Sequence, residues 1–518
     1  MTSENKIITS FNFWQTRNWV QAFYDFDIGA FRRLLREKGE EFWQTAGERR
    51  ALKLFHLAAE RVPAYKDFLK KHRIAHQKVR TIKDFAHVPI TDKKNYIQHY
   101  PLEARCWDGK LSSSDIIAVS SGTTGEPTFW PRGGYQEFEA AIIHELLYTS
   151  YFEIDRHSTL LIIAFPLGVY VSGVATLLPS WLLTEKGYPM SVMSVGTNKS
   201  EVLKSVNRLQ SRFDQIVLAG HPLAVKDVIE TGRSEGIRWS RTPLRLMFCS
   251  EDFTEGWRRY LAEQVGRPFQ YQNLISTYGS SELLLMAWET PLSILVRQLA
   301  VEHPEARRAL VGDEYVPNMF QYNQLFRYAE EDEDELIFTS ASGVPLIRYN
   351  LHDSGCIVPY RVMQETLTHV EPHWKARLRR GGWHAPLSRL PFLCLKGRSD
   401  HTIIFQAANI YPEHVRLSLH YRPFLKILTG KFAMRKGYLK NMDEYFEVNI
   451  ELKKGVNATP ALARLIRERM VHKLKKLNLE YRFISQYDKD TRPRIKLWPY
   501  QHQKYFKPGL KPRYIVKE

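Results

Sequence analysis

Hydrophobic residues follow a helical spacing near the start of the chain and a different pattern after about residue 115. Over residues 42–68, apolar side chains recur at roughly helical intervals until Pro63 interrupts them. From Asp115 onward, short apolar runs alternate with longer amphipathic segments; examples of these runs are residues 116–119, 160–165, 215–219, 245–249 and 335–339. Such alternation is typical of α/β layers with much parallel strand pairing. We therefore predict a mainly helical lead-in over residues 1–100 and an α/β fold with layered sheets after it.

The pattern changes again near Gly397. Strand-like runs follow at residues 402–405 and 445–452, then a helical pattern over residues 460–477 and a basic tail punctuated by prolines. A segment of roughly 120 residues is large enough for an independent domain. We predict a large N-terminal domain over residues 1–397 and a small α+β domain over residues 398–518.

Composition narrows the class of protein. The chain is 44% hydrophobic and 25% charged, without an apolar run approaching the roughly 18 residues that span a bilayer. The first residues lack the basic flank and apolar run of a secretory signal, so we expect a cytoplasmic protein without a membrane partner. The cysteines form no CxxC pair, which argues against a zinc ribbon or a disulfide framework and favours reduced thiols at Cys106, Cys249, Cys356 and Cys394.

The net charge is unusual, because 74 basic residues against 56 acidic ones give +18. The excess is strongest over residues 488–518, and residues 375–389 are also rich in Lys, Arg and His. Nucleic acid, an anionic membrane or polyanionic small molecules would each suit this charge, although a basic surface is usually only solvated. Charge alone therefore selects no partner.

The sharpest local motif is SSGTTGEPT at residues 120–128, between a strand-like run and a helical pattern over residues 135–151. Its glycines permit a tight turn, and its hydroxyls and backbone N–H groups suit phosphate oxygens. No Gly-Lys-Ser/Thr follows, so it is not the loop of kinases and GTPases, and an ordinary polar turn is the plain alternative. The phosphate-binding residues of this interpretation are Ser120, Ser121, Gly122, Thr123, Thr124 and Gly125.

This motif resembles the phosphate loop of the adenylate-forming superfamily, particularly its phenylacetate–CoA ligase-like branch. RVPAYKDF at residues 61–68 and HVPITDKKNY at residues 87–96 are similar to the helical lead-in of that family. The resemblance extends from about Phe42 to the C-terminus. It implies ATP and Mg²⁺ as cofactors, a small-molecule carboxylic acid as substrate, and a large adenylation domain with a small mobile C-terminal domain. Glu126 departs from the family, which usually has Lys there; we expect its side chain to point away from the triphosphate.

Two further motifs are similar to those with which the family binds the nucleotide. YGSSE at residues 278–282 implies that Tyr278 faces adenine, that Gly279 and Ser280 lie beside it, and that Glu282 binds Mg²⁺ and assists catalysis. PLIRYNLHD at residues 345–353 implies that Asp353 accepts hydrogen bonds from both ribose hydroxyls. A weaker resemblance, to a Gly-Glu pair that flanks adenine, assigns Ser250 and Glu251 to the same site.

The second half-reaction is expected to depend on the small domain. KGRSD at residues 396–400 resembles the family's hinge motif, so Arg398 would bind ribose or the α-phosphate and Asp400 would be the hinge. Thr124 and Arg398 join Glu282 in the catalytic set. The family's catalytic lysine near the C-terminus is best matched by Lys511; the alternatives are Lys496 and Lys507.

The acid and its acceptor are less specific. By resemblance the acid pocket would be lined by Phe165, Tyr170, Gly173, His221 and Ser276, which suits an aryl or medium-sized acid. CoA is our first choice of acceptor, but Ala407 stands where the family commonly has Gly, so a carrier-protein thiol or an amine stays open. A third hypothesis is a non-catalytic binding protein, for nucleic acid as one example, which Glu126 and the net charge favour. The competent residues above argue against it, and we make no prediction of oligomeric state.

Overall fold

The computed structural model describes residues 3–11, 18–113, 116–120, 127–168, 171–266, 270–312, 316–398, 402–419, 421–487 and 491–506. The chain divides into two compact units. Unit 1 comprises Met1–Val119 and Phe129–Gly397, and unit 2 comprises Ser120–Thr128 and Arg398–Glu518. Each unit has its own hydrophobic core.

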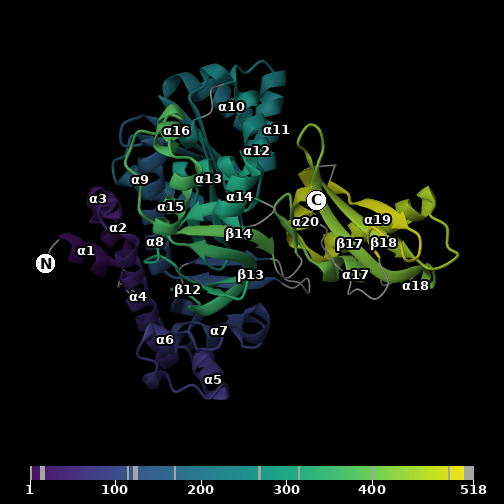
Figure 1. Cartoon of the computed structure of the whole chain (residues 1–518), viewed down its shortest axis with the longest axis horizontal. Coiled ribbons are helices and arrows are strands. Elements are labelled where there is room, and N and C mark those ends of the chain that lie inside the picture. Colours follow the sequence, from purple (N-terminus) through teal and green to yellow (C-terminus); the bar gives the residue numbers. More distant parts are fainter. Residues whose placement is uncertain are drawn as a thin grey trace. The chain divides into compact units, whose positions relative to one another are not determined.

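Unit 1 begins with a helical lead-in, drawn in purple in Figure 1. Pro63 ends one helix and starts another, because the residue before a proline is driven out of the helical region; Val62 accordingly has φ −104° and ψ 109°. The predicted helical segment and its break are confirmed. The helices are α1 (Ser3–Ser10), α2 (Trp19–Tyr24), α3 (Ile28–Glu37), α4 (Glu40–Arg61), α5 (Pro63–Lys71), α6 (Ile82–Phe85) and α7 (Leu102–Arg105).

The centre of unit 1 is a large mixed sheet. Within the described residues it has 12 strands, ordered β11-β12-β13-β14-β10-β9-β8-β7-β6-β4-β5, with β1 paired to β13. The pairs β5–β4, β4–β6, β6–β7 and β7–β8 are all parallel, as the alternating pattern predicted. The strands are β1 (Thr91–Asp92), β4 (Thr159–Ile163), β5 (Met190–Ser194), β6 (Gln215–Gly220), β7 (Leu244–Phe248), β8 (Leu274–Ser280), β9 (Leu284–Trp288), β10 (Asn318–Gln321), β11 (Tyr328–Asp332), β12 (Glu335–Ser340), β13 (Leu346–Val358) and β14 (Phe392–Arg398). A separate two-stranded sheet pairs β2 (Ile116–Ser120) with β3 (Thr128–Arg132).

Helices connect and cover these strands. The helix that follows β3 is α8 (Gly134–Leu147), and almost all of its residues are buried. The other helices of unit 1 are α9 (Val171–Glu185), α10 (Lys199–Leu209), α11 (Pro222–Ser234), α12 (Glu255–Val265), α13 (Pro291–Glu302), α14 (Pro304–Val311), α15 (Tyr360–Val370) and α16 (Trp374–Arg380).

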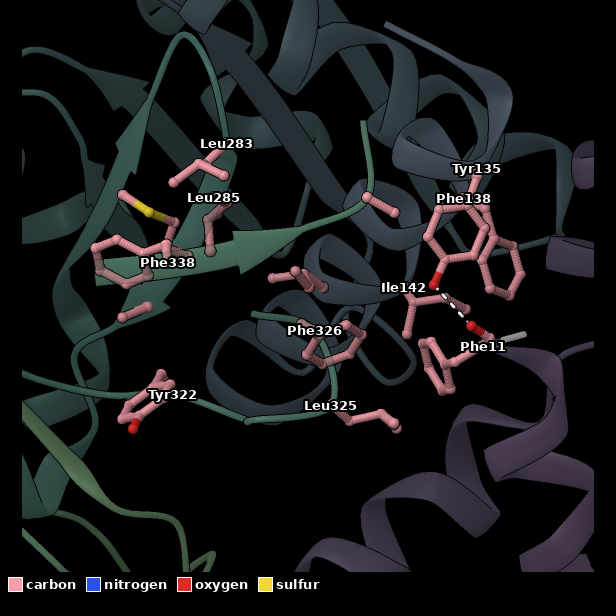
Figure 2. Close-up of a cluster of buried hydrophobic side chains, with 14 of the residues drawn as sticks. Phe11, Tyr135, Phe138, Ile142, Leu283, Leu285, Tyr322, Leu325, Phe326 and Phe338 are labelled. Carbon is pink, nitrogen blue, oxygen red and sulfur yellow. Dashed lines mark hydrogen bonds between the residues drawn. The ribbon is translucent and has the colours of Figure 1, made fainter. Parts of the chain in front are cut away.

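Aromatic packing ties the lead-in helices to this core. Figure 2 shows Phe11 beside Phe138 of α8 and Phe326, with ring centroids 5.9 and 5.2 Å from that of Phe11. The hydroxyl of Tyr135 donates a hydrogen bond of 2.9 Å to the carbonyl oxygen of Phe11. The lead-in is therefore an integral part of unit 1, since removing it would expose these rings to water.

Unit 2 has a three-stranded sheet ordered β17-β18-β19 and a hairpin of β15 and β16. Its predicted strands and its long helix are confirmed, and the helix begins and ends where the sequence pattern does. The elements are β15 (Ile403–Phe405), β16 (Ala408–Ile410), α17 (Pro412–Leu419), α18 (Arg422–Ile427), β17 (Leu428–Tyr438), β18 (Glu444–Leu452), α19 (Pro460–Leu477), α20 (Leu479–Tyr487) and β19 (Arg494–Trp498).

Across the described residues of both units, none of the helices combines the length and the apolar character that crossing a bilayer requires.

Candidate active site

The predicted site residues of unit 1 gather at the ends of parallel strands. Phe165 follows β4, His221 follows β6, Ser250 follows β7, and Tyr278 lies near the end of β8. Because these strands are parallel and adjacent, their carboxyl ends meet at one edge of the sheet. That edge is where open α/β sheets bind their ligands.

Two residues that are 75 positions apart meet directly. The hydroxyl of Tyr278 donates a hydrogen bond to Oδ2 of Asp353 on β13, and both residues are buried. The Tyr278 ring lies against Phe320, with a centroid separation of 5.8 Å and an interplanar angle of 22°. The ring is thereby fixed, and its hydroxyl holds the orientation of the carboxylate.

The turn between β8 and β9 is tight, and hydrogen bonds hold it in place. A Cβ atom on Gly279 would lie 2.6 Å from the carbonyl oxygen of Leu284, so a glycine is needed there. The amide of Gln136 on α8 donates to the carbonyl oxygen of Glu282 at 3.3 Å, and the backbone N–H of Leu283 donates to Oγ of Ser280 at 3.1 Å. These bonds place Glu282, which is 9% exposed, in a turn of defined geometry.

Ser250 occupies a left-handed backbone position, with φ at +76°. This conformation costs an L-residue about 1–2 kcal/mol, whereas glycine adopts it freely. The finding explains why a glycine would be favoured before the buried Glu251, and strain of this kind is often retained at functional sites.

The residues predicted to line the acid pocket form two contacts. The rings of Phe165 and His221 meet edge to face at 5.3 Å, and a Cβ atom on Gly173 would lie 2.3 Å from the carbonyl oxygen of Pro166. Gly173 therefore lets α9 pack closely against the chain beside Phe165. Ser276 takes part in neither contact. Its backbone N–H donates a 2.7 Å hydrogen bond to the buried carboxylate of Glu289.

His221 is neutral at physiological pH. Burial lowers its pKa to about 4, and the hydrogen bond with the carbonyl oxygen of Cys249 opposes that shift. Since a carbonyl only accepts, Nδ1, 3.4 Å from that oxygen, carries the proton and Nε2 presents a lone pair. The side chain can thus accept a hydrogen bond from a ligand.

Part of the predicted site lies outside the described residues. Ser120 ends β2 and Arg398 ends β14, and each lies directly beside such a segment. The predicted residues in these segments are Ser121, Gly122, Thr123, Thr124, Gly125, Glu126, Tyr170, Asp400, Lys507 and Lys511.

In unit 2, the alternative catalytic lysine is held in an ion pair. Nζ of Lys496 lies 2.8 Å from the carboxylate of Glu447, and the Lys496 side chain is 53% exposed, whereas that of Glu447 is 2% exposed. Ala407 lies in the β15–β16 turn with φ at +66°, which explains why glycine is favoured at that position.

Sequence patterns missed two features. Gln136, which anchors Glu282, carries no local signal because its role depends on the packing of α8 under the turn. Cys356 and Cys394, although 38 positions apart in the chain, lie on the neighbouring strands β13 and β14. A hydrogen bond from Cys394 lowers the pKa of the Cys356 thiol to about 7.

Metal chemistry is restricted by the side chains available. Within the described ranges, no group of three or more His, Cys, Asp or Glu side chains is arranged to hold a metal ion. A Mg²⁺ ion bound mainly by phosphates and water needs fewer protein ligands, and the carboxylate of Glu282 is the hard oxygen donor that such an ion prefers.

Comparison with known proteins supplies relatives across most of the chain. A phenylacetate–coenzyme A ligase of Aromatoleum evansii is 22% identical over 443 residues, which cover 83% of this chain and 88% of that protein. A phenylacetate–coenzyme A ligase of Thermus thermophilus is 24% identical over 378 residues, which cover 72% of this chain and 74% of that protein. No protein-family model matches the chain.

Solved structures share the fold. The 2-hydroxyisobutyryl-CoA ligase, in complex with 2-HIB-AMP and CoA in its thioesterification state, superposes with a TM-score of 0.64 at 15% identity. The match covers 93% of this chain and 91% of that structure. An open conformation of the same ligase gives a TM-score of 0.52 at 15% identity, over 92% of this chain and 91% of that structure.

Proposed function

This chain is a homologue of the phenylacetate–coenzyme A ligases and has the fold of the adenylate-forming CoA ligases, and on that premise we propose a two-step reaction. In the first step the carboxylate of an acid attacks the α-phosphorus of ATP, which gives an acyl-adenylate and pyrophosphate. In the second step a thiol, which we propose is that of CoA, attacks the acyl carbon and releases AMP. The 2-hydroxyisobutyryl-CoA ligase, which was solved with an acyl-AMP and CoA bound, supports this order of events.

The observation that carries the proposal is the contact between Tyr278 and Asp353. A carboxylate has about four sites for hydrogen-bond donors, so Asp353 can accept from Tyr278 and still accept from two ribose hydroxyls. Tyr278 orients the carboxylate, and the carboxyl edge of the parallel strands lies beside it. The pair is therefore suited to hold the sugar of ATP.

Charge in the first step is proposed to be balanced by cations. Glu282 would hold Mg²⁺, which neutralises phosphate charge when bound, and the hydroxyls of Thr123 and Thr124 would contact phosphate oxygens. We assign the catalytic lysine to Lys511, because Lys496 already pairs with Glu447. Arg398 is proposed to bind ribose or the α-phosphate, with Asp400 as the hinge for the second step.

The acid is proposed to lie against Phe165 and Gly173, beside His221. An aromatic ring and a close backbone approach suit a flat aryl acid or one of medium size. Because Nε2 of neutral His221 accepts hydrogen bonds, an acid with a hydroxyl or amide N–H group near its carboxylate would gain a further interaction.

A carrier-protein thiol or an amine is the alternative acceptor, and Ala407 is the observation that favours it. Ala407 keeps the left-handed backbone conformation that a glycine would adopt in this turn. The difference from the family's glycine is therefore the added methyl group. Product analysis with CoA, carrier proteins and amines as competing acceptors distinguishes these reactions.

The test of the first step is acid-dependent exchange of pyrophosphate into ATP over a panel of aryl, hydroxy and medium-chain acids. We expect exchange with at least one acid. Asp353→Asn should lower kcat/KM for ATP by about 10–100-fold, and Tyr278→Phe by about tenfold, because each removes a charge-assisted hydrogen bond. Tyr148→Phe is a matched control, since its buried hydroxyl bonds only to Ser180 Oγ, at 3.3 Å, within the described part of the chain. Absence of exchange with every acid would refute the proposal.

The assignment of the lysine has its own test. Lys511→Ala should abolish exchange while Lys496→Ala retains most of it. The reverse result would transfer the catalytic role to Lys496.

A further inference from the structure

A cavity lies in unit 1, and none of the residues that line it is among those assigned to the adenylation site. It has a volume of about 780 Å³, within the range of small-molecule sites. Its walls are the end of α3, the start of α4, the first turn of α15, helix α16 and the segment over residues 383–389. Helices α15 and α16 are labelled in Figure 1. We call this cavity the basic cleft.

Positive charge dominates the basic cleft. Five of the residues that line it are cationic: Arg36, Arg361, Lys375, Arg379 and Arg389. They face two acidic residues, Glu40 and Glu41. The Glu40 carboxylate is already engaged, because the backbone N–H groups of Tyr360 and Arg361 donate to it at the start of α15. The balance of charge favours an anion.

Among the described residues, Arg361 is the one cation of the cleft that has an ion-pair partner. Arg361 lies 3.8 Å from Glu365, and both of these side chains are well exposed. Within the described part of the chain, no carboxylate lies within ion-pair distance of Arg379 or Arg389. Guanidinium groups in this state are free to form bidentate hydrogen bonds with phosphate oxygens.

Aromatic rings give the cleft a second kind of surface. Tyr360 and Trp383 are partly exposed in its wall. Each of these rings packs against another aromatic ring. Tyr360 stacks on Phe392 with a ring-centroid separation of 6.5 Å, and the ring centroids of Trp383 and Tyr151 are 5.7 Å apart. Rings fixed in this way are platforms on which a planar base can stack.

One buried donor in the wall also lacks an acceptor. The indole N–H of Trp383 forms no hydrogen bond with any of the described residues. An indole nitrogen only donates, and an unsatisfied buried donor costs about 1–3 kcal/mol.

From these features we propose that the basic cleft binds a nucleotide, with its phosphates on Arg379 and Arg389 and its base against Trp383 or Tyr360. Phosphate alone would leave the aromatic wall unused, and an uncharged aromatic compound would leave the arginines unused. Neither Tyr278 nor Asp353 lines the basic cleft, and the proposal does not depend on the adenylation chemistry.

Equilibrium dialysis of the full chain against radiolabelled ADP, in the presence of EDTA, tests the proposal. We expect two ADP molecules per chain for the wild type. Arg379→Gln with Arg389→Gln should weaken one of them by about tenfold or more for each arginine, because each loses a charge-assisted contact. Asp353→Asn should weaken the other, so the failure of one site is distinguishable from the failure of the other.

Controls separate the site from general charge and from misfolding. Arg208→Gln with Arg212→Gln removes the same charge from exposed positions in another part of unit 1 and should leave both binding events unchanged. The cleft arginines are exposed, so the melting temperature and pyrophosphate exchange of the double variant should match the wild type. ADP binding that is unchanged in the Arg379→Gln/Arg389→Gln variant, or a wild type that binds ADP only at the site weakened by Asp353→Asn, would overturn the proposal. Binding of a short RNA, but not of ADP, through the same arginines would also overturn it.

Discussion

Unit 1 contains two groups of arginines that look alike in the sequence and differ in their surroundings. Arg258 and Arg297 are buried, and both contact the carboxylates of Glu255 and Glu289. Arg379 and Arg389, in the basic cleft, are exposed, and no carboxylate in the described ranges pairs with them. A buried charge must be neutralised by the fold, whereas an exposed one need not be. The net charge of +18 therefore includes arginines that stabilise the fold and arginines available to a ligand.

The strongest test of this comparison removes a carboxylate from the buried group. Glu289→Gln leaves Arg258 and Arg297 with less negative charge in the interior, and we expect a loss of about 3–5 kcal/mol in the free energy of unfolding. Urea denaturation followed by circular dichroism measures it. Arg379→Gln is the matched change in the cleft and should stay within about 0.5 kcal/mol of the wild type. Equal losses for the two variants would contradict the distinction.

A half-buried thiol extends the comparison to a group that titrates. The hydrogen bond from Cys394 lowers the pKa of Cys356 to about 7, with Lys396 acting in the same direction and burial against both. The thiolate fraction rises as the pH passes through that value, so alkylation by iodoacetamide should accelerate about tenfold between pH 6 and pH 8. Mass spectrometry of the labelled peptide measures the rate.

The buried Cys106 is the internal reference for this measurement. Burial raises its pKa to about 11, so it should stay unlabelled throughout the same pH range. Cys394→Ala, which removes the donor, should slow labelling of Cys356 at pH 7. A rate at Cys356 that does not change with pH would show that the thiol pair is not formed.

The ion pair of Lys496 is intermediate in exposure between the two groups of arginines. The Lys496 side chain is exposed, whereas that of its partner Glu447 is buried. We expect Lys496→Ala to lower the free energy of unfolding by about 1 kcal/mol or less, since solvent screens the exposed charge and Asn449 still donates to Glu447 at 3.1 Å. Thermal unfolding of the full chain checks it. A loss as large as that of Glu289→Gln would mean that one buried partner is enough to make an ion pair structural.

The smallest effect concerns the backbone. Ala407 has φ at +66°, which costs an L-residue about 1–2 kcal/mol, and a glycine would recover most of that while adding chain entropy of about 0.5–1 kcal/mol. Ala407→Gly should therefore raise the free energy of unfolding by about 0.5 kcal/mol. Ala463→Gly, inside helix α19, should lower it by about 1 kcal/mol. A loss of stability in both would show that Ala407 is not strained.

Local sequence was enough to locate the elements and to indicate the family. Hydrophobic spacing is a local property, so it predicted the break at Pro63, the parallel strands and helix α19 at their observed positions. The short sequence motifs likewise indicated Tyr278, Gly279 and Asp353. Nucleotide binding requires a glycine turn and a carboxylate, whatever residues surround them.

Which of these residues meet was settled only by the packing of distant segments. Tyr278 and Asp353 are 75 positions apart, and their hydrogen bond exists because the strand order brings β8 and β13 into one sheet. The support of Glu282 by Gln136, the pairing of Cys356 with Cys394 and the gathering of arginines around the basic cleft arise in the same way. Local patterns are silent on such contacts, because they depend on how remote parts of the chain come together rather than on the residues next to them.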